Sequence, residues 1–123
     1  MILLVEDEAI PRYDFAQKLR SQGYEVLEAI DGAEAIDLLE KHYPAITLVI
    51  TDMVMPKVNG LELIANIQAR WAKVPVIMLS AYMSQSGGDR ILGQHAQFLM
   101  KPVRPSALMA AVRGVVSQPL LQS

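Results

Sequence analysis

The sequence predicts an α/β domain in which helices cover both faces of a five-stranded parallel sheet. Short β-branched runs alternate with longer segments of helical spacing along the whole 123-residue chain. Strands that alternate with helices pair in parallel through right-handed crossovers, so this order favours a doubly wound (βα)5 fold. The runs ILLV, ITLVI and VIML are almost wholly apolar, as strands buried on both faces are.

The β-branched runs and the segments of helical spacing predict where the strands and helices lie. The expected strands cover Ile2–Val5, Tyr24–Ala29, Ile46–Thr51, Val74–Leu79 and Ala96–Met100. The helices with a clear apolar stripe or cap cover about Ala9–Gln22, Gly32–His42, Asn59–Trp71 and Pro105–Val116. Their expected inner faces are formed by Ala35, Ile36 and Leu39, by Leu63, Ile64 and Ile67, and by Leu108, Val112, Val115 and Val116.

Cap and breaker residues set several of these limits. Pro11 is compatible with the first helix only in its first turn, and Gly23 supplies its stop. Asp31 is expected to cap the second helix, which ends before Pro44. The expected fourth helix includes Ser84–Asp89, where two adjacent glycines each cost about 1 kcal/mol, so it should be short, irregular or mobile.

The strand compositions also predict the order of the sheet. Glu25 and Glu28 in the second strand and Gln97 in the fifth indicate edge positions. An order of 2-1-3-4-5 places these two strands outermost, which is the flavodoxin-like winding. We expect one domain over residues 1–118 and a frayed tail over residues 119–123.

Composition excludes several kinds of protein. The chain has no cysteine, which rules out a disulfide framework, a thiolate zinc site and a cysteine nucleophile. The net charge is −2 and the basic residues are scattered, so no nucleic-acid surface is expected. The apolar runs are too short to cross a membrane. With no leader before the first strand, we expect a cytoplasmic protein.

Carboxylates gather where the winding reverses. Ligands of open parallel sheets bind beyond the carboxyl ends of the strands at that point, here between the first and third strands. Glu6, Asp7 and Glu8 leave the first strand and Asp52 leaves the third. Like charges packed together raise a pKa or bind a cation, and oxygen ligands suit Mg²⁺ or Mn²⁺. Acidic loop ends that merely face solvent are the alternative.

A hydroxyl and an ammonium leave neighbouring strands at the same edge. Ser80 follows the fourth strand and Lys101 follows the fifth. Beside a metal-bound carboxylate, the two could neutralise and hydrogen-bond a phosphoryl group. Taken singly, Lys101 could form an ordinary salt bridge to the acidic cluster and Ser80 could be a strand-end cap.

Four ordered motifs resemble response-regulator receiver domains. They are ILLVEDE at 2–8, VITDMVMPKVNGLEL at 49–63, MLSAY at 78–82 and FLMKP at 98–102, and the resemblance covers nearly the whole chain. It implies that Asp52 is the phosphorylated aspartate. It also implies that Asp7, Asp52 and the backbone carbonyl of Val54 bind Mg²⁺ directly, with Glu6 reaching the ion, commonly through water.

The resemblance further implies a switch. Ser80 and Lys101 match the pair that contacts the phosphoryl group, and Phe98 matches the aromatic whose rotation reports phosphorylation. Pro102 follows a lysyl bond that is cis in many members of the family. Such a domain takes its phosphoryl group from a histidine kinase, a histidine phosphotransfer protein or a small phosphodonor. It then changes the face made by the fourth helix, fifth strand and fifth helix toward a downstream protein. It is a signalling switch that catalyses only its own phosphoryl transfer and dephosphorylation.

The chain departs from the family pattern in three places. Glu6 stands for the more usual aspartate, Gln94-His95 replace a usual Gly-Ala pair, and Ser84–Asp89 weakens the fourth helix. These differences leave the phosphorylation motifs intact and put partner recognition in doubt. The cognate kinase, the oligomeric state and the phosphate lifetime stay open, as does the choice between a stand-alone regulator and a piece of a hybrid kinase.

Three rival functions are weaker. An aspartyl-phosphate hydrolase would need a second aspartate two positions after Asp52, where Val54 stands. A nucleotide- or flavin-binding module would need a phosphate loop where the acidic run 6–8 follows the first strand. A docking module that is never phosphorylated is the third rival, and the set of Asp7, Asp52, Ser80 and Lys101 speaks against it. Met53, Met55, Met78 and Met100 are expected to fill gaps in the core or at the pocket rim.

Overall fold

Five parallel strands form one sheet in the order β2-β1-β3-β4-β5, as the edge residues predicted. The computed structural model describes residues 1–53, 59–80 and 96–116. The strands are β1 (Ile2–Val5), β2 (Val26–Ala29), β3 (Leu48–Asp52), β4 (Val76–Ser80) and β5 (Ala96–Met100). The helices are α1 (Ala9–Ser21), α2 (Gly32–His42), α3 (Gly60–Arg70) and α5 (Pro105–Val116).

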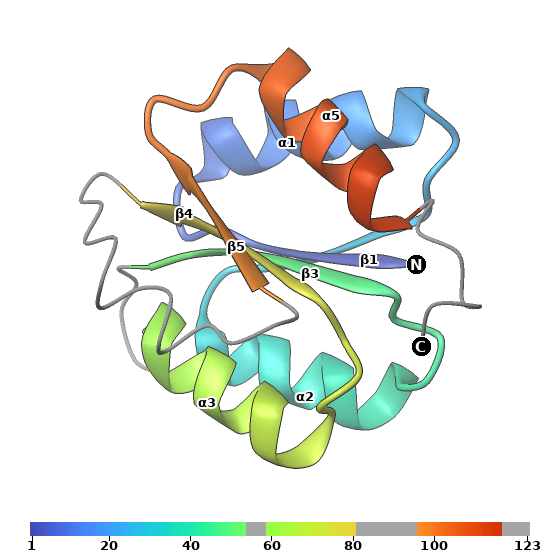
Figure 1. The fold of residues 1–123 in the computed structure, drawn as a ribbon, viewed down its shortest axis with the longest axis vertical. Helices are drawn as coiled ribbons and strands as arrows, with labels where there is room; N and C mark the ends of the chain where they lie inside the picture. The colour runs from blue at the N-terminus through green and yellow to red at the C-terminus, as the bar shows by residue number, and fades with distance from the viewer. Residues whose placement is uncertain (54–58, 81–95, 117–123) are drawn as a thin grey trace.

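The helices lie in two layers, with α1 and α5 on one face of the sheet and α2 and α3 on the other (Figure 1). Side chains alternate along β1, so Ile2 and Leu4 join the core under α1 and α5, and Leu3 and Val5 join the core over α2 and α3. All four are at most 1% exposed. A central strand is buried on both faces and therefore needs apolar residues at every position. This is why the run ILLV predicted a central strand.

The ends of the helices confirm the predicted caps. The Asp31 side chain accepts a hydrogen bond from the Glu34 N–H at 2.8 Å at the start of α2. Gly23 has a φ of 94° after α1, a conformation that glycine adopts without strain. At the start of α3, Asn59 and Glu62 form a reciprocal capping box that the sequence analysis had not singled out. These caps fix where each helix begins relative to the sheet.

Two central strands are displaced toward the carboxyl edge relative to the prediction. β3 and β4 begin two residues later than expected and end one residue later, at Asp52 and Ser80. Asp52 pairs with Leu79, and Ser80 pairs with Met100. Both polar residues therefore belong to the hydrogen-bonded ladder, which holds their backbones in place.

Other expectations have mixed outcomes. Trp71, at the end of the third predicted helix, is 7% exposed and packs in the core. Val116 was expected on the inner face of α5 but is 40% exposed, because it lies at the margin of the apolar stripe in the last turn. Met100, expected as a gap filler, is 54% exposed on the edge strand.

The predicted fourth helix and the tail 119–123 lie outside the described residues. None of the described helices is long and apolar enough to cross a membrane.

Candidate functional site

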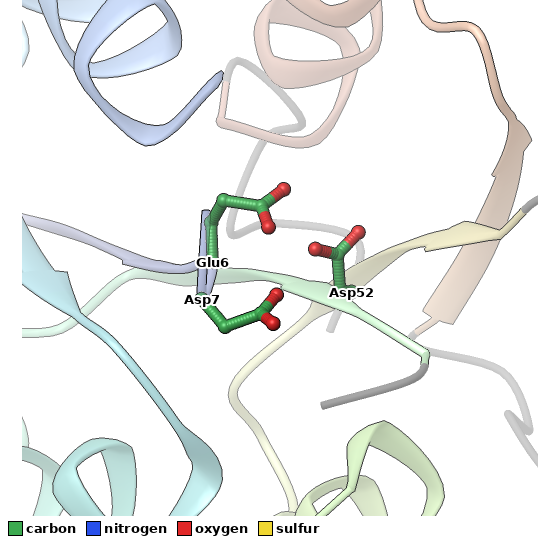
Figure 2. A group of neighbouring side chains, drawn as sticks. All are labelled: Glu6, Asp7 and Asp52. Atoms are coloured by element: carbon green, nitrogen blue, oxygen red, sulfur yellow. The ribbon is translucent and has the colours of Figure 1, made fainter. Parts of the chain in front are cut away.

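Three carboxylates converge where β1 and β3 end side by side. Glu6 and Asp7 follow β1, and Asp52 is the last residue of β3, whose Thr51 pairs with Val5. Figure 2 shows the three side chains pointing toward one another. Each offers one oxygen, and these oxygens all lie within 4.8 Å of one another. The predicted acidic cluster therefore exists, and its donor set suits a hard cation.

The cluster has a buried side and an open side. Glu6 is 2% exposed and Asp52 is 1% exposed, whereas the neighbouring Asp7 is exposed. Glu6 and Asp7 are consecutive, so their side chains leave the backbone in different directions (Figure 2). The solvent-facing side of the cluster is therefore the Asp7 side.

The charge on Glu6 is strongly disfavoured. Burial, followed by the hydrogen bond and the charge of Asp52, raises the pKa of Glu6 from 4.5 to about 8. The Glu8 N–H opposes this rise in pKa by donating to Glu6 Oε2 at 3.1 Å. Arg12 Nη1 donates to the Glu6 backbone carbonyl at 2.9 Å and Arg12 Nε lies 3.3 Å from Glu28, which joins this turn to β2. Without a cation, the cluster therefore holds a proton near neutral pH.

Lys101 supplies the positive charge of the site. Its Nζ lies 2.5 Å from Asp52 Oδ1, and its backbone N–H donates to the Ser80 carbonyl at 2.8 Å. Burial lowers the pKa of Lys101, but the hydrogen bond and charge of Asp52, with the charges of Glu6 and Glu8, more than offset it and raise the pKa above 10.5. Lys101 is thus held in its charged form beside Asp52.

The buried oxygen of Asp52 fits a ligand-binding role. Asp52 Oδ1 is fully buried, and the partner found for it in the described part of the chain is the Lys101 ammonium. A carboxylate oxygen can accept from more than one partner. An oxygen with one cationic neighbour, within reach of two further carboxylates, suits a bound divalent cation as well.

Ser80 reaches the same edge from β4 and is 3% exposed. Its Oγ donates a hydrogen bond to the thioether sulfur of Met53 at 3.1 Å. Sequence reasoning missed this contact, because it treated Met53 only as a gap filler. Because Asp52 pairs with Leu79, the next residues along the two strands, Met53 and Ser80, lie side by side. The register of β3 and β4 therefore brings these two side chains within reach of each other.

Gly60 fits tightly behind the end of β3. Its N–H donates to the Met53 carbonyl at 2.8 Å. A Cβ at this position would collide with the Asp52 carbonyl oxygen and lie 2.7 Å from the Met53 Cα. The start of α3 can therefore approach the site backbone only because residue 60 is glycine.

The structure describes two of the three other predicted site positions, Phe98 and Pro102. Phe98 is half-buried beside the core over α2 and α3, and it pairs with Met78 across the β4–β5 ladder. The Lys101–Pro102 peptide bond is cis, as the resemblance implied. Val54, predicted to offer its carbonyl to the metal, lies outside the described residues.

Residues 2–113 match the family model of the response regulator receiver domain. The chain belongs to this family. It is a receiver domain of the kind found in two-component response regulators, and the sequence motifs, strand order and acidic pocket all agree with that assignment.

Named relatives agree. The chain is 37% identical over 119 residues to the transcriptional regulatory protein PdtaR of Mycobacterium tuberculosis, covering 95% of this chain and 57% of the relative. Other curated relatives are also longer, and the chain spans about half the length of most of them.

Solved structures give the same result. The receiver domain of the hybrid histidine kinase CckA matches with a TM-score of 0.81 and 34% identity, over 94% of this chain and 98% of that one. A chain in the CheX-CheY-BeF3-Mg²⁺ complex of Borrelia burgdorferi matches with a TM-score of 0.87 and 29% identity, over 95% of this chain and 89% of that one.

Proposed function

We propose that this receiver domain accepts a phosphoryl group on Asp52 in a Mg²⁺-dependent reaction and thereby switches a signalling partner. The observation that supports this most directly is the surroundings of Asp52. Its buried carboxylate lies beside one ammonium and two further carboxylates at the carboxyl edge of the sheet. A nucleophilic oxygen, a cation site and a positive charge are the parts that phosphoryl transfer requires.

Asp7 and Asp52 would bind the metal directly, and Glu6 would reach it through water. The exposed Asp7 and the buried Asp52 offer oxygens from both sides of the cluster, and the role of Glu6 is assigned on the family resemblance. When bound, Mg²⁺ supplies positive charge to the phosphoryl oxygens and keeps part of its water shell. We assign the third protein ligand to the Val54 carbonyl on the family resemblance alone.

The remaining chemistry belongs to the side chains. An Asp52 oxygen attacks phosphorus, forming an O–P bond as the bond to the donor's imidazole nitrogen or acyl oxygen breaks, and the leaving group departs with the bonding electrons. Lys101 Nζ, already at Asp52, neutralises a phosphoryl oxygen. The Ser80 hydroxyl turns to donate to another phosphoryl oxygen, and Phe98 follows it.

The expected partners follow from the same proposal. The phosphodonor is a histidine kinase or a histidine phosphotransfer protein, and a small phosphodonor can replace it. The output face includes β5 and α5 together with the chain between β4 and β5. On β5, Met100 is 54% exposed, which suits a contact that forms and breaks. We place this switch in the cytoplasm, as a receiver that works alone or within a larger regulator or hybrid kinase.

Intact-mass spectrometry after incubation with acetyl phosphate tests the proposal. Wild type should gain one phosphoryl mass only when Mg²⁺ is present, and Asp52→Asn should gain none. Glu40→Gln removes a carboxylate from the distant α2 and should be phosphorylated like wild type. Absence of an adduct in folded wild type, at short as well as long incubation times, would favour a domain that only docks.

A further inference from the structure

Four residues of the site form a closed ring of contacts. Asp52 and Met53 are consecutive, and Lys101 and Ser80 lie opposite them. Lys101 Nζ contacts Asp52 Oδ1 at 2.5 Å, and Ser80 Oγ contacts Met53 Sδ at 3.1 Å. The Lys101 N–H donates to the Ser80 carbonyl at 2.8 Å and closes the ring. The Lys101 ammonium, which would contact the phosphoryl group, is thus paired with Asp52. The Ser80 hydroxyl, which would also contact it, is hydrogen-bonded to the adjacent Met53.

The direction of the Ser80–Met53 hydrogen bond is fixed by chemistry. A thioether sulfur carries no hydrogen and can only accept, so the single proton of the Ser80 hydroxyl points to Met53. The same proton is needed by a phosphoryl oxygen on Asp52. The hydroxyl cannot donate to both acceptors, and the two compete for it.

Met53 is well placed to compete because its backbone is held on both sides. Its N–H donates to the Leu79 carbonyl at 2.9 Å, and its carbonyl accepts from the Gly60 N–H at 2.8 Å. Its side chain also packs against the core over α2 and α3. The sulfur is therefore presented to Ser80 by a residue whose backbone is fixed on both sides.

We propose that Met53 is a positioning residue, whose sulfur holds the Ser80 hydroxyl in the resting orientation and so sets how readily the site binds a phosphoryl group. This inference rests on the proposed phosphorylation of Asp52. Sulfur is a weak acceptor, and a phosphoryl oxygen is a strong one. The hold is therefore weak enough to be released on phosphorylation and strong enough to bias the resting state.

The test measures the affinity for beryllofluoride in the presence of Mg²⁺ by fluorine NMR. Met53→Leu keeps the size and apolar character of the side chain and removes the acceptor. Loss of one weak hydrogen bond from the resting state should tighten binding about two- to fivefold. Met53→Gln puts a stronger acceptor on a chain of similar length and should weaken binding. Met109→Leu makes the same exchange as the first variant in the core under α5 and should bind like wild type.

A Ser80→Ala background separates positioning from packing. If Met53 acts through the hydroxyl, Met53→Leu should change the affinity when Ser80 is present and leave it unchanged in the Ser80→Ala background. Methionine labelled with ¹³C in its methyl group reports the contact itself, because Ser80→Ala should shift the Met53 resonance in the metal-free protein. An equal effect of Met53→Leu in both backgrounds, or an unshifted resonance, would overturn the inference and leave phosphorylation standing. Wild type that binds no beryllofluoride would overturn both.

Discussion

Two ion pairs with the same separation lie at opposite ends of the sheet. At the carboxyl edge, Lys101 Nζ lies 2.5 Å from Asp52 Oδ1, and the Asp52 side chain is 2% exposed. At the other end, Arg70 lies 2.5 Å from Glu40, and both side chains are more than 40% exposed. The Arg70 guanidinium also lies 4.3 Å from the centre of the Trp71 ring.

The difference lies in the surroundings rather than in the distance. Arg70 and Glu40 balance each other in water and join α2 to α3, which is worth about 1 kcal/mol or less. One ammonium faces three carboxylates at the carboxyl edge, two of them buried. Negative charge there is in excess and poorly solvated, so this region gives up stability that a bound cation can restore.

The largest expected effect is the pH dependence of metal-free stability. The folded pKa of Glu6 is raised from 4.5 to about 8, so the folded protein holds a proton that the unfolded chain releases. The free energy of unfolding should therefore fall by a few kcal/mol as the pH rises from 6 to 8.5. Denaturant titrations followed by circular dichroism would measure this.

Two variants sharpen that prediction. Glu6→Gln removes the titrating group and should flatten the pH dependence, whereas Glu40→Gln should leave it as in wild type. Stability that stays constant or rises between pH 6 and 8.5 in metal-free wild type would contradict the account of Glu6.

The second effect is a difference in sign between the two ion pairs. Asp52→Asn breaks the buried pair but relieves repulsion from Glu6 and Asp7. At pH 8 without metal it should raise the free energy of unfolding by about 2 kcal/mol, because the relieved like-charge repulsion outweighs the lost contact with Lys101. Glu40→Gln should lower it by about 0–1 kcal/mol. If both variants lower the free energy of unfolding, both ion pairs stabilise the fold and the predicted difference in sign is wrong.

The third effect is stabilisation by the metal. Mg²⁺ at a tenfold excess over its Kd should raise the free energy of unfolding of wild type by about 1.4 kcal/mol. The gain should be lost in Asp7→Asn, because Asp7 belongs to the cluster. It should be kept in Glu40→Gln, because Glu40 lies outside the cluster. Calorimetric melts with and without Mg²⁺ would show this, and an equal gain in Asp7→Asn would place the ion elsewhere.

Much of this site could be predicted because strand order alone brings its residues together. Once β1 and β3 are neighbours, Asp7 and Asp52 must meet at their carboxyl ends, although 45 positions of sequence separate them. Lys101 follows β5 at the same edge, and it lies beside Asp52. The strand order itself could be predicted from composition. Wholly apolar runs indicated the central strands, and strands with charged or polar residues indicated the edges.

The rest depends on geometry that a periodic pattern does not encode. The sequence showed two adjacent acids at 6 and 7 but not that Glu6 would be buried and Asp7 exposed. The carboxyl ends of β3 and β4 were predicted one residue short because polar residues follow the apolar runs, whereas the ladder continues to Asp52 and Ser80. The contact of Met53 with Ser80 follows from that register, so it could not be predicted before the register was known.

The position of Trp71 has a practical consequence. It is the single tryptophan of the chain, and it follows α3 at the end opposite the carboxylates, with its ring 6.4 Å from that of Tyr43. Its fluorescence therefore observes the far end of the domain. A change in its emission when Mg²⁺ or a phosphodonor is added would mean that a rearrangement had travelled along α3. A constant emission would confine the response to the carboxyl edge and make Trp71 a clean optical probe of unfolding.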